Sequence, residues 1–172
     1  MKKRTKEIPV KSLKYHQAIF AMGCFWSPDL IFSKISGIIS TVVGYTGGKD
    51  EYKSPTYEQV CSGRTGHAEA VQITFDQGKI SYKKLLDLFW KNHNPTTINR
   101  QGPDIGSQYR SAIFYIDEEQ KSEALESKKE FQKTLDKPIV TEIVKAKEFY
   151  PAEEYHQSYL KKHGKESCHI NY

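Results

Sequence analysis

Short runs of apolar residues alternate along the chain with segments in which apolar residues recur every three or four positions. The runs predict strands at residues 17–22, 38–45, 68–75, 109–116 and 139–144. The helical spacing predicts a helix from Ser27 to about Gly37 and further helices at residues 81–93, 117–135 and 152–162. The first six elements follow the order βαββαβ, which predicts an α+β fold with a ferredoxin-like core and an αβα C-terminal extension.

The first predicted helix has a clear start signal shortly after a cysteine. Ser27 is a candidate N-cap, Pro28 suits the first helical position, and Asp29 places negative charge in the first turn. Cys24 therefore lies where a strand ends, close to the partial positive charge of a helix N-terminus. Such a position lowers the pKa of a thiol and makes its thiolate available as a nucleophile. A buried, unreactive thiol fits the same pattern, and both interpretations stand at this point.

Length and composition indicate one globular domain. The chain has 172 residues, of which 37% are hydrophobic and 12% aromatic, a composition too aromatic for a disordered chain. Its longest apolar stretch, residues 18–26, is far short of the ~20 residues that span a bilayer, so we expect no membrane partner. The basic N-terminus is not followed by a continuous apolar segment with a cleavage site, and we expect a cytoplasmic protein.

The net charge of +5 is concentrated at the N-terminus, because residues 1–14 hold six Lys and Arg residues against a single Glu. We predict a basic, mobile arm over residues 1–14, a single catalytic domain over residues 15–163 and a mobile tail over residues 164–172. A nucleic-acid binder that uses the arm is the first alternative function. The neutral remainder of the chain disfavours it, and we expect no nucleic-acid partner.

Glu69 lies on the apolar side of a predicted strand. Alternation along residues 67–75 places its side chain on the same face as Val71, Ile73 and Phe75. Desolvation there raises the pKa of a carboxyl and keeps it protonated, which suits a general acid. A Glu that reaches solvent at the strand end, or that pairs with Arg64, is the alternative.

Residues 93–110 form a connection that is long for a compact domain, which is typical of functional loops. Asp104 lies between two glycines and can bind a substrate N–H group, and Tyr109, at the predicted strand start, can donate its phenol to a developing oxyanion. The alternatives are an Asp-stabilised turn and an ordinary strand aromatic. The loop lacks the spacing of a phosphate-binding loop.

Six blocks of sequence, in order between residue 16 and about residue 162, resemble the methionine sulfoxide reductase A family. They are Gly-Cys-Phe-Trp at 23–26, Gly-Tyr-Thr-Gly-Gly at 44–48, Pro-Thr-Tyr-Glu-Gln-Val at 55–60, Gly-Arg-Thr-Gly-His-Ala-Glu-Ala-Val at 63–71, Gln-Gly-Pro-Asp-Ile-Gly-Ser-Gln-Tyr-Arg-Ser at 101–111 and Tyr-His-Gln-Ser-Tyr-Leu at 155–160. The resemblance implies thiol-dependent reduction of methionine-S-sulfoxide to methionine, in proteins and as the free amino acid, which repairs oxidative damage.

The resemblance also implies a role for each candidate residue. Cys24 would attack the sulfoxide sulfur, and Glu69 would protonate the sulfoxide oxygen. The remaining roles are hydrogen bonding to that oxygen by Tyr57 and Tyr109, contact with the substrate methyl group by Phe25 and Trp26, and binding of the substrate backbone amide by Asp104.

Recycling in the family implies a second thiol and no bound cofactor. Cys24 would be left as a sulfenic acid, a resolving cysteine would capture it as a disulfide, and thioredoxin or a dithiol would reduce that disulfide. Cys168, in the tail, is the candidate resolver, although this tail lacks the glycines usual in the family. Direct recycling of Cys24 by an external thiol is the alternative, and Cys61 is expected to be a small buried residue.

The family usually continues Cys-Phe-Trp with Gly-x-Glu, where this chain has Ser27, Pro28 and Asp29, a change expected to affect the helix start only. The implied partners are oxidised proteins or peptides and thioredoxin, and we expect a monomer. A metal site formed by the cysteines with histidines at 67, 156 or 169 lacks ligand spacing, so we expect no metal. A non-catalytic module is the last alternative.

Overall fold

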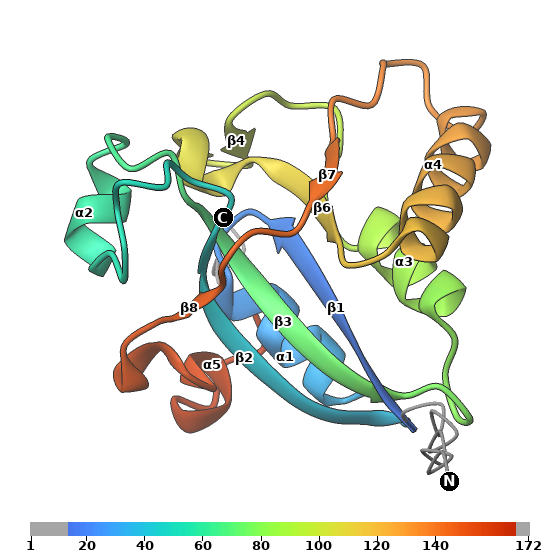
Figure 1. Ribbon diagram of the computed structural model, residues 1–172, viewed down its shortest axis with the longest axis horizontal. Coiled ribbons are helices and arrows are strands. Elements are labelled where there is room, and N and C mark those ends of the chain that lie inside the picture. The colour runs from blue at the N-terminus through green and yellow to red at the C-terminus, as the bar shows by residue number, and fades with distance from the viewer. Residues whose placement is uncertain (1–13, 168–172) are drawn as a thin grey trace, which may run out of the picture.

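The protein has a mixed α/β fold in which helices pack around a central six-stranded sheet (Figure 1). The computed structural model describes residues 14–167. The strand order is β7-β6-β1-β3-β2-β8, and all neighbouring strands are antiparallel except β6 and β7. The strands are β1 (Tyr15–Met22), β2 (Ile38–Thr46), β3 (Ala68–Asp76), β6 (Ser111–Tyr115), β7 (Glu142–Lys145) and β8 (Tyr150–Pro151).

Helices and short elements complete the fold. The helices are α1 (Trp26–Ser33), α2 (Tyr57–Cys61), α3 (Tyr82–Lys91), α4 (Glu118–Gln132) and α5 (Tyr159–Lys162). Two short strands, β4 (Arg100–Gln101) and β5 (Asp104–Ile105), form a separate hairpin, and two 3-10 helices are η1 (Ser107–Tyr109) and η2 (Glu154–His156). Helices α3 and α4 lie side by side next to β1 and β6, whereas α1 and α5 pack near β2 (Figure 1).

The sheet separates two apolar clusters because successive side chains of a strand point to opposite faces. On one face Val71, Ile73 and Phe75 of β3 pack with the buried residues of α1 and α3, among them Phe32 and Phe89. On the other face a smaller cluster is formed by the small residues of β1, β3 and β6 together with Ile19 and Phe114. Glu69 belongs to the face of the larger cluster, as the alternation in the sequence predicts.

Most predicted elements are present, but three local predictions are wrong. The segment 152–162 is not one helix: it contains η2 and α5, separated by Ser158 in a left-handed conformation with φ of 53°. Helix α1 begins at Trp26, its N-cap is Phe25, and no side chain caps it, so Ser27 is not the cap. Tyr109 lies in η1, before the strand that it was expected to begin.

Further predictions concern the ends of the chain and membranes. Residues 1–13 and 168–172 lie outside the described part of the chain, and with them lie almost all of the predicted arm and the candidate resolver Cys168. Within residues 14–167, no helix is long and apolar enough to cross a membrane.

Candidate active site

One cavity of about 230 Å³ brings together seven of the eight residues singled out in the sequence. They come from five parts of the chain: the β1–α1 junction, the first residue of α2, the start of β3, the β4–β5 hairpin and η1. The lining residues are Cys24, Phe25, Trp26, Tyr57, Glu69, Asp104, Tyr109 and His156. The eighth predicted residue, Cys168, lies outside residues 14–167.

Cys24 lies directly before the N-cap of α1, closer to the helix than the sequence indicated. The chain reaches this position through Gly23, which has φ of +87°, and a Cβ at Gly23 would approach Gln101 Cβ to 2.6 Å. Glycine is therefore required here both for the turn and for the close packing of the β4–β5 hairpin. The helix N-terminus offers backbone N–H groups that no side chain caps, an environment that favours an anion at the cysteine.

Glu69 is the second residue of β3 and is only 2% exposed. In the sheet it lies opposite Tyr45 of β2, and its side chain reaches the cavity from the apolar face. Glu69 is thus a buried carboxyl at the cavity, on the face of the sheet that the alternation in the sequence predicts.

Two phenols share the cavity with Glu69. Burial raises the pKa of Tyr109 well above its usual range. Burial likewise raises the pKa of Tyr57, and the proximity of the Cys61 thiol adds to the shift. Both side chains are therefore hydrogen-bond donors at neutral pH.

Two aromatic side chains of the β1–α1 junction also line the cavity. Phe25 is buried, and the indole of Trp26 stacks on Tyr159 with ring centroids 3.7 Å apart. The indole N–H of Trp26 also donates a hydrogen bond of 3.1 Å to His156 Nδ1. The wall is thus fixed by stacking on one side and by a hydrogen bond on the other.

His156 is the lining residue that sequence reasoning did not select. It is 2% exposed, and burial lowers the pKa of its imidazole, although Glu153 acts in the opposite direction. Its ring lies 5.1 Å from the ring of Phe25 and 4.6 Å from that of Tyr57, measured between centroids. The signal that could have identified it is its place in the last of the six sequence blocks.

The position of Cys61 shows that another prediction is wrong. The residue was expected to be buried, but it is exposed at the last position of α2. The short helix turns it outward because Val60, one residue earlier, is the residue that faces the core.

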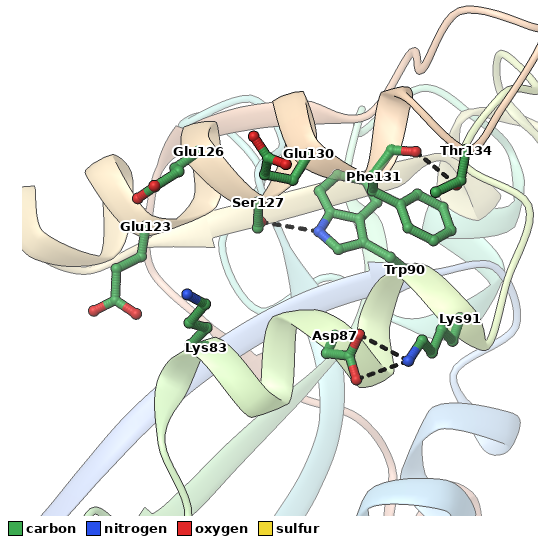
Figure 2. A pocket seen from close by; sticks show the side chains of 10 residues that line it. All are labelled: Lys83, Asp87, Trp90, Lys91, Glu123, Glu126, Ser127, Glu130, Phe131 and Thr134. Atoms are coloured by element: carbon green, nitrogen blue, oxygen red, sulfur yellow. Dashed lines mark hydrogen bonds and ion pairs between the residues drawn. The ribbon is translucent and has the colours of Figure 1, made fainter.

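A larger groove of about 360 Å³ lies between α3 and α4 (Figure 2). Its apolar floor is formed by Trp90 and Phe131, and the indole N–H of Trp90 donates a hydrogen bond of 2.9 Å to Ser127. The groove contains no cysteine and none of the predicted site residues. Over residues 14–167, no group of three His, Cys, Asp or Glu side chains is placed to hold a metal ion.

Comparisons with known proteins show the family to which the chain belongs. A profile of the family described as peptide methionine sulfoxide reductase matches residues 16–172. The peptide methionine sulfoxide reductase MsrA of Methanosarcina acetivorans is 57% identical over 150 residues, which cover 86% of this chain and 79% of the relative.

Solved structures of similar fold lead to the same family. Mxr1 from Saccharomyces cerevisiae in its reduced form superposes with a TM-score of 0.85 and 37% identity, over 92% of this chain and 91% of the other. Mxr1 in complex with Trx2 gives a TM-score of 0.62 and 28% identity, over 90% and 91% of the two chains.

The fold, the cysteine cavity and these matches define an oxidoreductase that acts on sulfur. More narrowly, the chain belongs to the peptide methionine sulfoxide reductase family and is of the MsrA type.

Proposed function

We propose that this protein reduces methionine-S-sulfoxide, in proteins and as the free amino acid, to methionine, and that it thereby repairs oxidative damage. The observation that carries the proposal is the convergence of a cysteine at a helix N-terminus, a buried carboxyl and two phenols on one small cavity. The matches to MsrA proteins support the same reaction.

The proposed reductase step uses Cys24 as the nucleophile and Glu69 as the acid. The thiolate attacks the sulfoxide sulfur while the sulfoxide oxygen takes a proton, and the S–O bond breaks. Methionine sulfur is reduced by two electrons and Cys24 is oxidised by two, so that the products are methionine and a sulfenic acid.

The other lining residues bind and orient the substrate in this proposal. Tyr57 and Tyr109 donate hydrogen bonds to the sulfoxide oxygen, which holds it toward Glu69. Phe25 and Trp26 surround the terminal methyl group, whose transfer from water to an apolar wall is favourable. Asp104, on the β4–β5 hairpin, accepts a hydrogen bond from the substrate backbone amide.

Recycling requires a second thiol, and we assign it to Cys168. The resolver must approach Cys24 closely, because a disulfide needs Cα atoms within ~7 Å. Tyr159 of α5 stacks on Trp26 beside Cys24, α5 ends at Lys162, six residues before Cys168, and an extended chain of six residues would span roughly 20 Å. Reduction of the resulting disulfide by thioredoxin is supported by the structure of Mxr1 in complex with Trx2.

The proposal also covers the fold class, the oligomeric state and the location of the protein. The antiparallel order β6-β1-β3-β2, with α1 and α3 as the connecting helices, supports classification of the core as ferredoxin-like. We further propose a monomer with a mobile arm and tail around one catalytic domain, free of bound cofactors and located in the cytoplasm, where thioredoxin keeps thiols reduced.

The test is incubation of the protein with S and R epimers of a methionine sulfoxide peptide and a dithiol reductant. The proposal predicts consumption of the S epimer alone and loss of activity in Cys24→Ser, because a neutral hydroxyl cannot replace the thiolate. Consumption of the R epimer at the same rate, or an active Cys24→Ser protein, would show that the proposed reaction is wrong.

A further inference from the structure

Glu153 connects several walls of the cavity without lining it. The residue lies between β8 and η2, at the N-cap position of η2, and its side chain is 34% exposed. Nearby, the amide of Gln157 exchanges two hydrogen bonds of 2.9 Å with the backbone of Val43. The C-terminal segment is thereby fixed to β2, and the carboxylate of Glu153 is held at a defined place.

The first oxygen of Glu153 holds helix α2. Oε1 accepts a hydrogen bond of 2.9 Å from the backbone N–H of Tyr57, the first residue of that helix. This N–H has no partner within its own helix, because the first N–H groups of a helix never do. The side chain of the N-cap residue Thr56 does not reach it, because that side chain accepts a hydrogen bond from the backbone N–H of Gln59 in a capping box. Glu153 therefore sets the start of α2, from which the phenol of Tyr57 enters the cavity.

The second oxygen holds the residue that packs behind the apolar wall. Oε2 accepts a hydrogen bond of 2.9 Å from the hydroxyl of Tyr45, whose side chain is fully buried. The ring of Tyr45 packs against Phe25, with centroids 5.8 Å apart, and Tyr45 lies opposite Glu69 in the sheet. One carboxylate thus holds both the start of the helix that carries Tyr57 and the Tyr45 ring that packs against Phe25.

The same oxygen faces His156. Because His156 Nδ1 accepts the indole N–H of Trp26, the proton of the neutral ring is on Nε2, 3.6 Å from Glu153 Oε2. That distance is too long for a hydrogen bond, but the negative charge favours this tautomer and so keeps Nδ1 an acceptor for Trp26.

We propose that Glu153 is a positioning residue for the reductase step: it fixes Tyr57 and, through Tyr45 and His156, the Phe25 and Trp26 wall. The inference rests on the proposed function. Since Glu153 is not among the residues that line the cavity, its replacement keeps every reacting group present but removes the contacts that hold those groups in the reactive geometry. Displacement of about 1 Å in such groups costs up to about 10²-fold in rate.

The test measures methionine released in a single turnover, divided by the amount of reactive Cys24, in Glu153→Gln, Glu153→Asp and the matched control Glu154→Gln. Glu154 is the neighbouring residue, 92% exposed, with only a 3.9 Å ion pair to Lys162. At saturating peptide, we expect both Glu153 variants to react about 10- to 100-fold more slowly per reactive Cys24, and the control to match the wild type. The peptide concentration that gives half of the maximal single-turnover rate should be similar in all of them. The shorter Asp keeps the charge but cannot reach both donors.

A merely structural role would reduce the amount of reactive Cys24 and leave the rate per reactive thiol unchanged, and that result would overturn the inference. A Glu153→Asp protein with the wild-type rate would do the same, and this variant decides the matter if Glu153→Gln does not fold. The proposed function is judged separately: it fails if the wild type releases no methionine, whereas the inference about Glu153 fails only against an active wild type.

Discussion

Replacement of Glu69 by Gln tests the proposed proton source. Glutamine has nearly the same shape but carries no proton that it can transfer, so the substitution removes the acid and leaves the packing of β3 in place. General acid catalysis contributes about 10²- to 10⁴-fold, which corresponds to roughly 3–5 kcal/mol of barrier. At 2% exposure, Glu69 lies where bulk water has little access, so water is a poor substitute for the lost acid. We therefore expect the single-turnover rate to fall by at least about 10²-fold.

The assay is rapid mixing of the reduced protein with a methionine-S-sulfoxide peptide and quantification of methionine before any recycling. Alkylation of Cys24 by iodoacetamide, measured in parallel, should keep its wild-type rate, because in the proposed mechanism the thiolate depends on the N-terminus of α1 and not on Glu69. Glu58→Gln, an exposed position on α2, is the matched control and should react as the wild type does. A Glu69→Gln rate within about threefold of the wild type would refute the role of Glu69 as the acid.

Three further predictions concern recycling and stability. Cys168→Ser should release one methionine per protein at the wild-type rate but lose thioredoxin-driven turnover; unchanged turnover would show that Cys168 is not the resolver. Gly48→Ala should lower the free energy of unfolding by about 1–3 kcal/mol in urea titrations, because the new Cβ would overlap the His67 ring. An unchanged urea midpoint would contradict the close packing of Gly48 against His67. Burial lowers the pKa of His93 to about 4, so the folded state binds no proton there while the unfolded state binds one below about 6.5. Stability should therefore decline as pH falls from about 6.5 toward 4, with a smaller decline in His93→Gln, and equal slopes would exclude His93 as the cause.

The sequence predicted those features of the site that depend on local geometry. Alternation along β3 placed Glu69 among apolar residues because the side-chain period of a strand is fixed by the backbone. Cys24 was likewise located at a strand–helix junction from neighbouring residues alone. Asp104 was located on a loop and Tyr109 beside it, although the β4–β5 hairpin and η1 inside that loop were not predicted.

Contacts between distant segments explain what the sequence did not predict. Asp29 indicated a helix start at Ser27, but its carboxylate contacts distant segments of the chain. It accepts hydrogen bonds from the Thr41 hydroxyl, 2.5 Å away, and from the backbone N–H of Ser158, 2.9 Å away. The second contact accompanies the left-handed turn at Ser158 that interrupts the helix expected over residues 152–162. His156 and Trp26, 130 residues apart, meet only because that segment folds back on α1. Helix propensities carry no signal for such pairings.

The claim on which the account depends is that Cys24, and no other thiol, takes the oxidising equivalent from the sulfoxide. Its most direct measurement uses the Cys168→Ser protein, treated with one equivalent of methionine-S-sulfoxide peptide without reductant and then with a reagent that traps sulfenic acids. Peptide mapping by mass spectrometry should locate the adduct on Cys24 alone, in an amount equal to the methionine released. Methionine release with the adduct on Cys61, or with no adduct on Cys24, would contradict the account.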